Sequence, residues 1–419
     1  MNDNNILFEP FALGKLNVPG RVCKTATSET RASEDGFVTD ELLEFYEPIA
    51  KAGTPLIITG NLYVTEAGKS TYRMCGADAP DKVPGLKRWA DLVHSHGSLL
   101  FGQINHCGRQ VFAEAMGLDS AVSASNVTEK VMGTKPRPLT TDEIKDTIDH
   151  FALSARYCRE AGFDGIQIHA GHGYLINQFL SPYTNRRKDE YGGNFNNRMR
   201  FLLDVYRAIR VHVGDDYPLI IKIGGADALT GRAGLKTPEL VEVARILQEE
   251  GLNGVEITVG HYESGFPMIR GTFGDFFEGL MKEGIGWQMT PFRKIGVTLF
   301  RQPISWLFNM IWPHYEGFNT HYATAFKRKL SIPVICVGGF LTRRAATEAV
   351  NNGRCDAVSV GRAMIADPYL YKHFKDNTTG PECSFCNGCI ARAGRLPVEC
   401  YDKKVKEAKD KMLAEMAEF

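Results

Sequence analysis

The chain of 419 residues is long enough to bury a large core, since 43% of it is hydrophobic. Its 49 Lys and Arg residues balance 49 Asp and Glu residues, so bulk charge favours neither nucleic acid nor an acidic membrane as a partner. The N-terminal sequence MNDNNILFEP predicts no secretory signal, and no apolar run approaches the roughly 20 residues that span a bilayer. The ten cysteines are scattered except for one C-terminal cluster, which favours a cytoplasmic location.

Eight short segments have the continuous apolar character of buried parallel strands, and turn residues bound each of them. They begin at Arg21 (RVCKT), Pro55 (PLIITG), Leu99 (LLFGQI), Gly165 (GIQIH), Pro218 (PLIIKI), Gly254 (GVEITV), Pro333 (PVICV) and Ala357 (AVSV).

Helical patterns lie between these strands. A capping-box spacing begins at Thr140, and the apolar period that follows it runs to Ala161. Thr237-Pro238 predicts the start of a second helix, and Thr342 can cap a third. This alternation predicts one (β/α)₈ barrel, the TIM-barrel class. A doubly wound open sheet is the alternative, but no G-x-G-x-x-G follows an early strand.

We expect the barrel to cover residues 1–380, with a loop of about residues 262–318 inserted between its sixth and seventh strands. Residues 381–419 form an extension that contains cysteines and ends in a predicted helix. No linker rich in Pro, Ser or Gly divides the chain. The sequence therefore predicts a single barrel domain with two additions.

Each of the last two predicted strands is followed by a glycine-containing dipeptide. Gly338-Gly339 follow the seventh strand, and Gly361-Arg362 follow the eighth. Glycine lets a backbone approach a phosphate closely, and arginine adds a charged donor. The same glycines could merely turn each strand into its helix. Two such sites on adjacent strands, one of which carries arginine, favour a phosphate site.

Two histidines and a tyrosine stand at the end of the fourth strand, in IQIHAGHGYLINQFLSP. His169 and His172 can bind a metal, donate hydrogen bonds to a ligand, or pack in the core. A metal site would need further ligands, either carboxylates or a third histidine, at neighbouring strand ends. Those ends carry donors instead, namely Ser28, Gln103 and Lys222. A polar heterocycle or an anion is favoured, and a metal-dependent hydrolase or lyase is the alternative from another class.

The segment HAGHGYLINQFLSPYTNRRKDEYGGNFNNRMRF resembles the signature of the old yellow enzyme family of FMN-dependent oxidoreductases. The likeness runs from FEPFALGKLNVPGRV to GRAMIADP, with motifs in register at strands one, three, four, five, seven and eight. The C-terminal CSFCNGC is most similar to the branch that includes 2,4-dienoyl-CoA reductase and its single-domain relatives. The resemblance implies noncovalently bound FMN, with NADH or NADPH as the hydride donor.

The resemblance also implies flavin contacts at the strand ends. Lys222, where many members have Arg, would face flavin N1 and O2 and stabilise the anionic reduced form. Ser28 would contact O4, where the family has Thr or Cys, and Gln103 would hold the pyrimidine edge. The other implied contacts are Ala26 and Thr27 (backbone), Gly60 (ring), and Gly338, Gly339, Gly361 and Arg362 (phosphate).

His169 and His172 would bind the carbonyl oxygen of a substrate, and Tyr174 would protonate the adjacent carbon. The implied activity is reduction of an activated C=C bond in an enone, an enal or an enoyl thioester. One alternative is a flavin-dependent dehydrogenase or demethylase that runs in the oxidative direction. Another is a protein that stores or senses flavin without turnover.

Within the inserted loop, the stretch from Gln302 to Tyr315 has no Asp, Glu, Lys or Arg. It is too short to span a membrane, although it could lie on one. Its position favours a lid, at about residues 276–315, that narrows access and selects an apolar small-molecule substrate. Peripheral membrane contact and a subunit interface are the alternatives.

Cys383, Cys386, Cys389 and Cys400 read C-x₂-C-x₂-C-x₁₀-C, which suggests a metal site. In the resembling reductases, four cysteines at wider spacing hold a 4Fe–4S cluster that relays electrons from a C-terminal FAD domain. Both gaps are one residue shorter here, and Phe419 ends the sequence before any such domain. A cluster would then lack an internal electron source, so we favour a reduced remnant or a zinc site over iron and sulfur.

Overall fold

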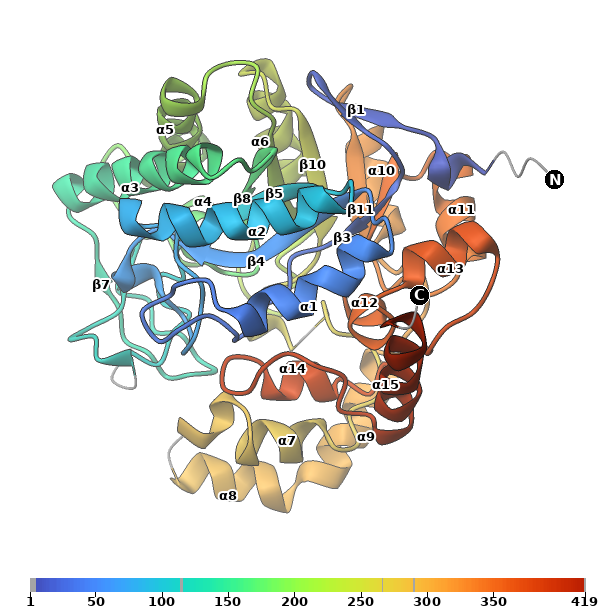
Figure 1. Ribbon diagram of the computed structural model, residues 1–419. Coiled ribbons are helices and arrows are strands. Elements are labelled where there is room, and N and C mark those ends of the chain that lie inside the picture. The colour runs from blue at the N-terminus through green and yellow to red at the C-terminus, as the bar shows by residue number, and fades with distance from the viewer. Residues whose placement is uncertain (1–4, 114–115, 266, 289–290, 418–419) are drawn as a thin grey trace.

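The centre of the molecule is a closed barrel of parallel strands (Figure 1). The computed structural model describes residues 5–113, 116–265, 267–288 and 291–417. Around the barrel the strands follow one another in chain order, so the TIM-barrel prediction is confirmed. Each of the eight predicted segments supplies one strand: β3 (Val22–Lys24), β4 (Leu56–Tyr63), β5 (Leu99–Asn105), β8 (Gly165–His169), β9 (Leu219–Gly224), β10 (Gly254–Thr258), β11 (Val334–Val337) and β12 (Ala357–Val360).

Helices cover the outside of the barrel (Figure 1). Thr140 caps α3 as predicted, because its hydroxyl accepts from the Glu143 N–H while the Glu143 carboxylate accepts from the Thr140 N–H. Thr342 caps α11 more simply, because its hydroxyl accepts from the Ala345 N–H without a reciprocal bond. The covering helices are α1 (Asp40–Lys51), α2 (Val83–Ser95), α3 (Thr141–Glu160), α4 (Leu175–Leu180), α5 (Phe195–Val213), α6 (Thr237–Glu249), α10 (Thr320–Lys327), α11 (Arg343–Asn351), α12 (Arg362–Ala366) and α13 (Leu370–Asp376).

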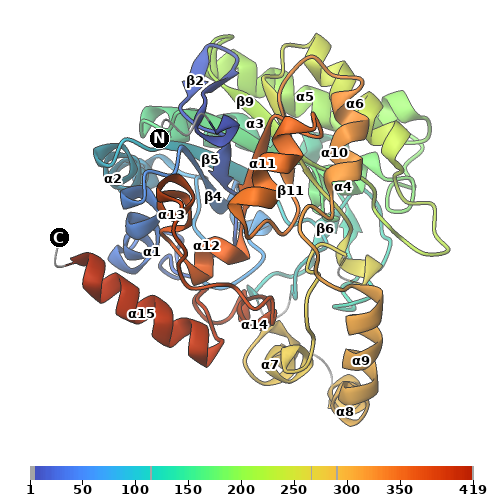
Figure 2. The same cartoon turned by 90° about the vertical axis from the view of Figure 1, so that its right-hand side faces the viewer.

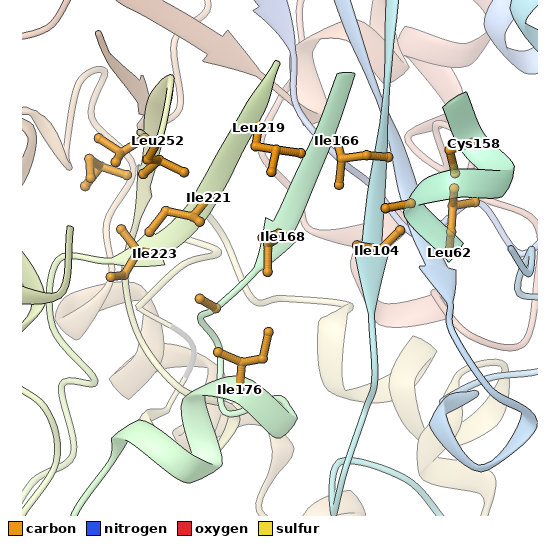
Figure 3. Close-up of a cluster of buried hydrophobic side chains, with 14 of the residues drawn as sticks. Leu62, Ile104, Cys158, Ile166, Ile168, Ile176, Leu219, Ile221, Ile223 and Leu252 are labelled. Atoms are coloured by element: carbon orange, nitrogen blue, oxygen red, sulfur yellow. The ribbon is translucent and has the colours of Figure 1, made fainter. Parts of the chain in front are cut away.

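Side chains that alternate along each strand divide the core into two parts. In β9, Ile221 and Ile223 join the buried cluster between strands and helices, which Figure 3 shows beside Ile166 and Ile168 of β8. Ile220 instead joins a separate cluster that fills the barrel lumen. Because the strand period is two, the next lumen-facing residue of β9 is Lys222. The first charged side chain of β9 in the lumen therefore lies one layer above the apolar cluster.

A short hairpin closes the amino-terminal end of this lumen. It consists of β1 (Phe11–Leu13) and β2 (Leu16–Val18), which pair antiparallel. Leu13 and Val18 are fully buried against the lumen cluster. This end of the barrel is a packed core, so ligands can enter only from the carboxyl ends of the strands. Small elements elsewhere are η1 (Ile6–Phe8), η2 (Glu66–Gly68), η3 (Pro80–Lys82), β6 (Val122–Ser123) and β7 (Arg137–Pro138).

The insertion and the C-terminal extension pack together at the carboxyl end of the barrel (Figures 1 and 2). Phe273 and Phe276 are buried against Ala391 of the extension. Residues 266 and 289–290 of the insertion lie outside the described residues. In the part that is described, no helix has the length and apolar character that crossing a bilayer requires. The elements of the insertion and the extension are η5 (Tyr262–Ser264), α7 (Phe276–Lys282), η6 (Ile285–Gln288), α8 (Pro291–Leu299), α9 (Arg301–Ile311), α14 (Gly388–Arg392) and α15 (Lys403–Ala417).

The Thr140→Ala substitution should lower the free energy of unfolding by about 1 kcal/mol, because it removes the acceptor at the first turn of α3. Urea denaturation monitored by circular dichroism measures this loss. Thr141→Ala is the matched control, since it removes a neighbouring threonine and leaves the cap intact. A loss of the same size in the control would show that the capping hydroxyl contributes nothing.

Candidate active site

Two adjoining cavities lie at the carboxyl ends of the barrel strands. The larger, of ≈ 260 Å³, is lined by nine of the predicted site residues: Ala26, Thr27, Ser28, Gln103, His169, His172, Tyr174, Lys222 and Arg362. The smaller, of ≈ 160 Å³, shares several of these and adds Gly338, Gly339 and Gly361. The fold thus brings together residues from both ends of the chain and from its middle.

Gly60 is the one predicted flavin contact that lines neither cavity. Its N–H donates to Glu29 Oε1 at 2.6 Å and to the Tyr46 hydroxyl at 3.1 Å. The β4–β5 register shifts between Ile58 and Asn61, and Asn61 lines the larger cavity instead. A Cβ atom at position 60 would lie 2.1 Å from the Glu29 carboxylate, so close packing alone requires glycine here.

The two histidines are neutral and adjacent, with His169 buried and His172 half-buried. Burial, the neighbouring imidazole and Lys222 hold the pKa of His169 well below 6.5, and burial with Lys222 lowers the pKa of His172 to about 3. The Gly171 N–H donates to His169 Nδ1 at 3.2 Å, which assigns the His169 proton to Nε2. That nitrogen faces His172 Nδ1 at 3.3 Å, and His172 Nε2 then donates to the Thr258 hydroxyl at 2.9 Å. Both rings are therefore neutral N–H donors.

A strained turn presents the second histidine to the cavity. His172 has φ of 58°, in the left-handed region that non-glycine residues seldom adopt. Gly173 follows with φ of 83°, and a Cβ atom there would lie 2.4 Å from His261 Nε2. The H-A-G-H-G sequence is thus a tight turn rather than a helix face. Strain of this kind persists where the surrounding structure overdetermines it, which is common at functional sites.

A pair of phenols lies beside the histidines. The Tyr174 ring packs edge-on against His169 with centroids 4.8 Å apart, and its hydroxyl lies 3.1 Å from that of Tyr262. Burial raises the pKa of Tyr174 well above 10, and burial also raises the pKa of Tyr262. Both phenols therefore keep their protons at neutral pH. Tyr262 was not predicted, although its place directly after the sixth strand was a usable signal.

A buried ion pair holds the lysine of the site. Lys222 Nζ lies 3.1 Å from Glu256 Oε2 and donates to the Thr25 hydroxyl at 2.8 Å. Burial raises the pKa of Glu256, but Lys222 and two neighbouring hydroxyls outweigh it, so the net pKa is lowered and the carboxylate is charged. Gln167 Nε2 donates to Glu256 at 3.0 Å, and Gln103 donates to Gln167. These hydrogen bonds cross the lumen through four strands.

One carboxylate of the site, Glu256, was not predicted from the sequence. Glu256 is fully buried in β10, one residue pair below the strand end. The signal was visible, because a single acidic residue interrupts an otherwise apolar strand in GVEITV. The carboxylate is bound to Lys222, however, and faces the lumen layer rather than the histidine pair.

The predicted phosphate residues form a close-packed cradle. Gly339 has φ of 69°, and a Cβ atom there would lie 2.9 Å from His314 Nε2. A Cβ atom at Gly338 would come within 3.2 Å of the Asn319 nitrogen. The Arg362 guanidinium, which lines both cavities, donates to the Arg270 carbonyl at 2.7 Å. A glycine cradle with a half-buried cation fits a phosphate group.

The four C-terminal cysteines converge near this arginine. The pKa of the Cys389 thiol is raised to about 12. Burial is the main cause and the other three thiols add to it, while Arg362 opposes them. All four thiols are free, and Cys389 lines the larger cavity. Across the described ranges, no group of three or more His, Cys, Asp or Glu side chains is arranged to hold a metal ion. We therefore assign no step to an iron–sulfur cluster or to zinc.

Comparison with known proteins places this site in a family. Residues 6–262 match the NADH:flavin oxidoreductase / NADH oxidase family, and residues 315–417 match the dihydrouridine synthase family. The NADH oxidase of Thermoanaerobacter brockii is 34% identical over 388 residues, which cover 92% of this chain and 53% of that protein. The multifunctional alkene reductase/demethylase OYE of Caballeronia cordobensis is 31% identical over 367 residues, or 87% of this chain and 48% of that protein.

A solved structure shows the same barrel. The 2-naphthoyl-CoA reductase in complex with 2-naphthoyl-CoA has a TM-score of 0.80 and 26% identity, covering 97% of this chain and 58% of that one. The chain spans about half the length of the two curated relatives above. The match of more than half the chain to one family model, on the barrel and site described here, is decisive: the chain belongs to the NADH:flavin oxidoreductase / NADH oxidase family and shares the barrel of old yellow enzymes.

Proposed function

We propose that this protein binds FMN, takes hydride from NADH or NADPH, and reduces an activated C=C bond in an enone, an enal or an enoyl thioester. One observation carries the proposal: two neutral imidazoles and a protonated phenol share a cavity with a buried lysine. Neutral donors suit an oxygen that becomes negative during the reaction, and a protonated phenol suits the carbon beside it. The family match supports the same chemistry.

The chain's own residues fit the cofactor. FMN, when bound, supplies hydride transfer to an electron-poor carbon. We assign its phosphate to the glycine cradle and Arg362, and its ring to the cavity wall of Ala26, Thr27 and Ser28. We assign Lys222 and Gln103 to the polar edge of the ring, because their hydrogen bonds within the lumen fix both side chains. The role of Gly60 rests on the resemblance alone.

The histidine pair can hold a carbonyl oxygen without first losing or gaining a proton. The N–H of His169 now faces His172, and that of His172 faces Thr258. Turning both donors toward one substrate oxygen exchanges two internal hydrogen bonds for two bonds to the substrate. Those bonds strengthen as negative charge develops on that oxygen, which is how an oxyanion hole lowers a barrier.

Tyr174 can then protonate the carbon next to the carbonyl group. Its hydroxyl lies among the lining residues of the cavity and is hydrogen bonded to Tyr262. The second phenol orients the first and can return a proton to it. Met268, Ile269, Ile390 and Val398 form an apolar part of the same wall. This wall favours an apolar substrate with one electron-withdrawing group.

The oxidative direction is the second candidate. The relative named alkene reductase/demethylase carries both kinds of activity in its name, and the same donors would serve either direction. The metal-dependent hydrolase finds no support, since both histidines are bound to each other, Gly171 and Thr258.

The central experiment separates the two half-reactions. We expect the purified protein to retain added FMN through gel filtration, to be bleached anaerobically by NADH or NADPH, and to regain its colour with 2-cyclohexenone. Tyr174→Phe should slow recovery of colour by about 10²–10⁴-fold and leave bleaching unchanged, because it removes only the proton donor. Stopped-flow absorbance measures both steps.

Tyr217→Phe is the matched control, because the Tyr217 hydroxyl donates to the Phe163 carbonyl and lines neither cavity. Replacing His169 and His172 together with Ala should abolish charge-transfer binding of phenols while FMN stays bound. A protein that shows no affinity for FMN would refute the proposal as a whole.

The neutral histidines also predict an acid dependence of stability. The unfolded chain binds protons near pH 6.5, whereas folded His172 resists protonation down to about 3. Stability is therefore lost as pH falls below 6.5, by up to about 1.4 kcal/mol per pH unit for each such histidine. The double variant His169→Asn/His172→Asn should show a shallower slope between about pH 7 and pH 5 in urea denaturation. His150→Asn, on the exposed face of α3, is the control, and an unchanged slope in the double variant would show that the pair is already charged.

The ion pair predicts a shift in redox potential. Glu256→Gln removes a negative charge beside Lys222, so the lysine charge can act more fully on an anionic reduced flavin. We expect the midpoint potential of bound FMN to rise by at least about 30 mV, equivalent to about 1.4 kcal/mol for two electrons. Equilibration with a reference dye measures it, and Glu239→Gln, on α6 outside the barrel, is the control. An unchanged or lower potential would place Lys222 away from the flavin.

A further inference from the structure

Exposed apolar side chains concentrate on the insertion. We define its outer face as Ile295, Leu299, Phe300, Trp306, Met310 and Ile311, all of them exposed, with Leu299 at 72% and Trp306 at 63%. Elsewhere in the described part of the chain, large exposed apolar side chains are scattered singly, as at Phe37 and Val211. Exposed apolar side chains gathered on two consecutive helices mark an interaction surface.

The outer face is not the side by which the insertion holds to the barrel. The opposite side of α9 already has its partner, because Phe308 packs against Phe273 and Phe277 with ring centroids 5.3 Å apart. Ile304 lies in the same cluster. A helix that is apolar all round needs a second apolar partner on its other side. Packing within the described part of the chain therefore leaves the outer face without an apolar partner.

The outer face also stands away from the cavities. In both views α8 forms the lower end of the molecule, beyond α7 and α14 (Figures 1 and 2), and in Figure 2 α9 rises from it along the outer edge. The insertion contributes Met268 and Ile269 to the wall of the larger cavity, and among the described side chains none from α8 or α9 lines that cavity. Covering the cavity, the lid role expected from the sequence, does not account for the exposed side chains of these two helices.

Charge identifies the partner. Residues 284–315 contain no Asp or Glu, and their cationic residues are Arg293, Lys294 and Arg301, of which Arg301 forms an ion pair with Glu278 of α7. Two copies of the chain joined through this face would bring like charges together, which disfavours a symmetric dimer. An anionic lipid surface instead attracts such residues, while Trp306 suits the boundary between headgroups and acyl chains. Short helices with one apolar and one basic side lie in that boundary.

We propose that the outer face of α8 and α9 binds the surface of a bilayer that contains anionic phospholipid. The two helices lie in the plane of the membrane and do not cross it. The barrel stays on one side, with the carboxyl ends of its strands directed toward the lipid. The proposal stands on the exposed face and its charge, and it is independent of the reaction proposed above.

Co-sedimentation with sucrose-loaded vesicles tests this. The intact protein should sediment with vesicles of phosphatidylglycerol and phosphatidylcholine, and less with phosphatidylcholine alone or at high salt. The double variant Leu299→Asp/Trp306→Asp should bind at least about tenfold more weakly. Val211→Asp is the matched control, because Val211 is 84% exposed on α5, away from the insertion. Thermal melting and FMN retention should be the same in all three proteins.

The wild-type measurement decides the matter even if the double variant fails to fold. No sedimentation with anionic vesicles would overturn the proposal. Equal binding by a folded double variant would overturn it as well, since the lipid contact would then lie elsewhere. Analytical ultracentrifugation tests whether a second copy of the chain binds the outer face instead. If the wild-type protein is a dimer, the double variant is a monomer and neither binds vesicles, the outer face is a subunit interface and the proposal is overturned. Lys294→Glu adds a second variant that keeps the apolar side chains, and it should weaken binding to anionic vesicles only.

Discussion

The structure depends on a charged pair enclosed within the barrel. Lys222 and Glu256 lie 3.1 Å apart in the lumen, directly above a layer of apolar side chains. Removing two charges from water is costly, and a pair of apolar residues would often be as stable. The Gln167 side chain donates to Glu256 Oε2, and the Thr25 hydroxyl accepts from Lys222. Such an arrangement is expected where a ligand above it needs a cation of fixed position.

The same principle of fixed, preorganised donors governs the histidine turn. His172 adopts a left-handed backbone conformation, and Gly173 leaves room for His261 beside it. Both imidazoles are neutral, so each offers an N–H group without a mobile proton or a net charge. Together with Lys222 and Arg362, the cavity has two cations and several neutral donors. That asymmetry suits chemistry in which negative charge forms at two separate places.

Local patterns in the sequence were sufficient for the barrel and for most of the site. Apolar runs located all eight strands because parallel strands are buried on both faces, and glycines marked where strands give way to loops. Strand ends then placed Gln103, His169 and Lys222 correctly in one cavity. Tyr262 and Gln167 were not found, because their importance comes from partners on other strands. Such pairings depend on barrel register, which no local pattern encodes.

The insertion shows a different limit of the sequence. Its aromatic composition indicated an apolar function, yet composition alone cannot say which side of a helix is already covered. Phe308 and Trp306 stand two positions apart, and only the packing shows that the first faces α7 while the second faces outward. The inner side also joins the cavity wall, since Met268 and Ile269 belong to the same cluster as Phe308. The insertion therefore has two apolar sides with different surroundings, one in the cavity wall and one at the molecular surface.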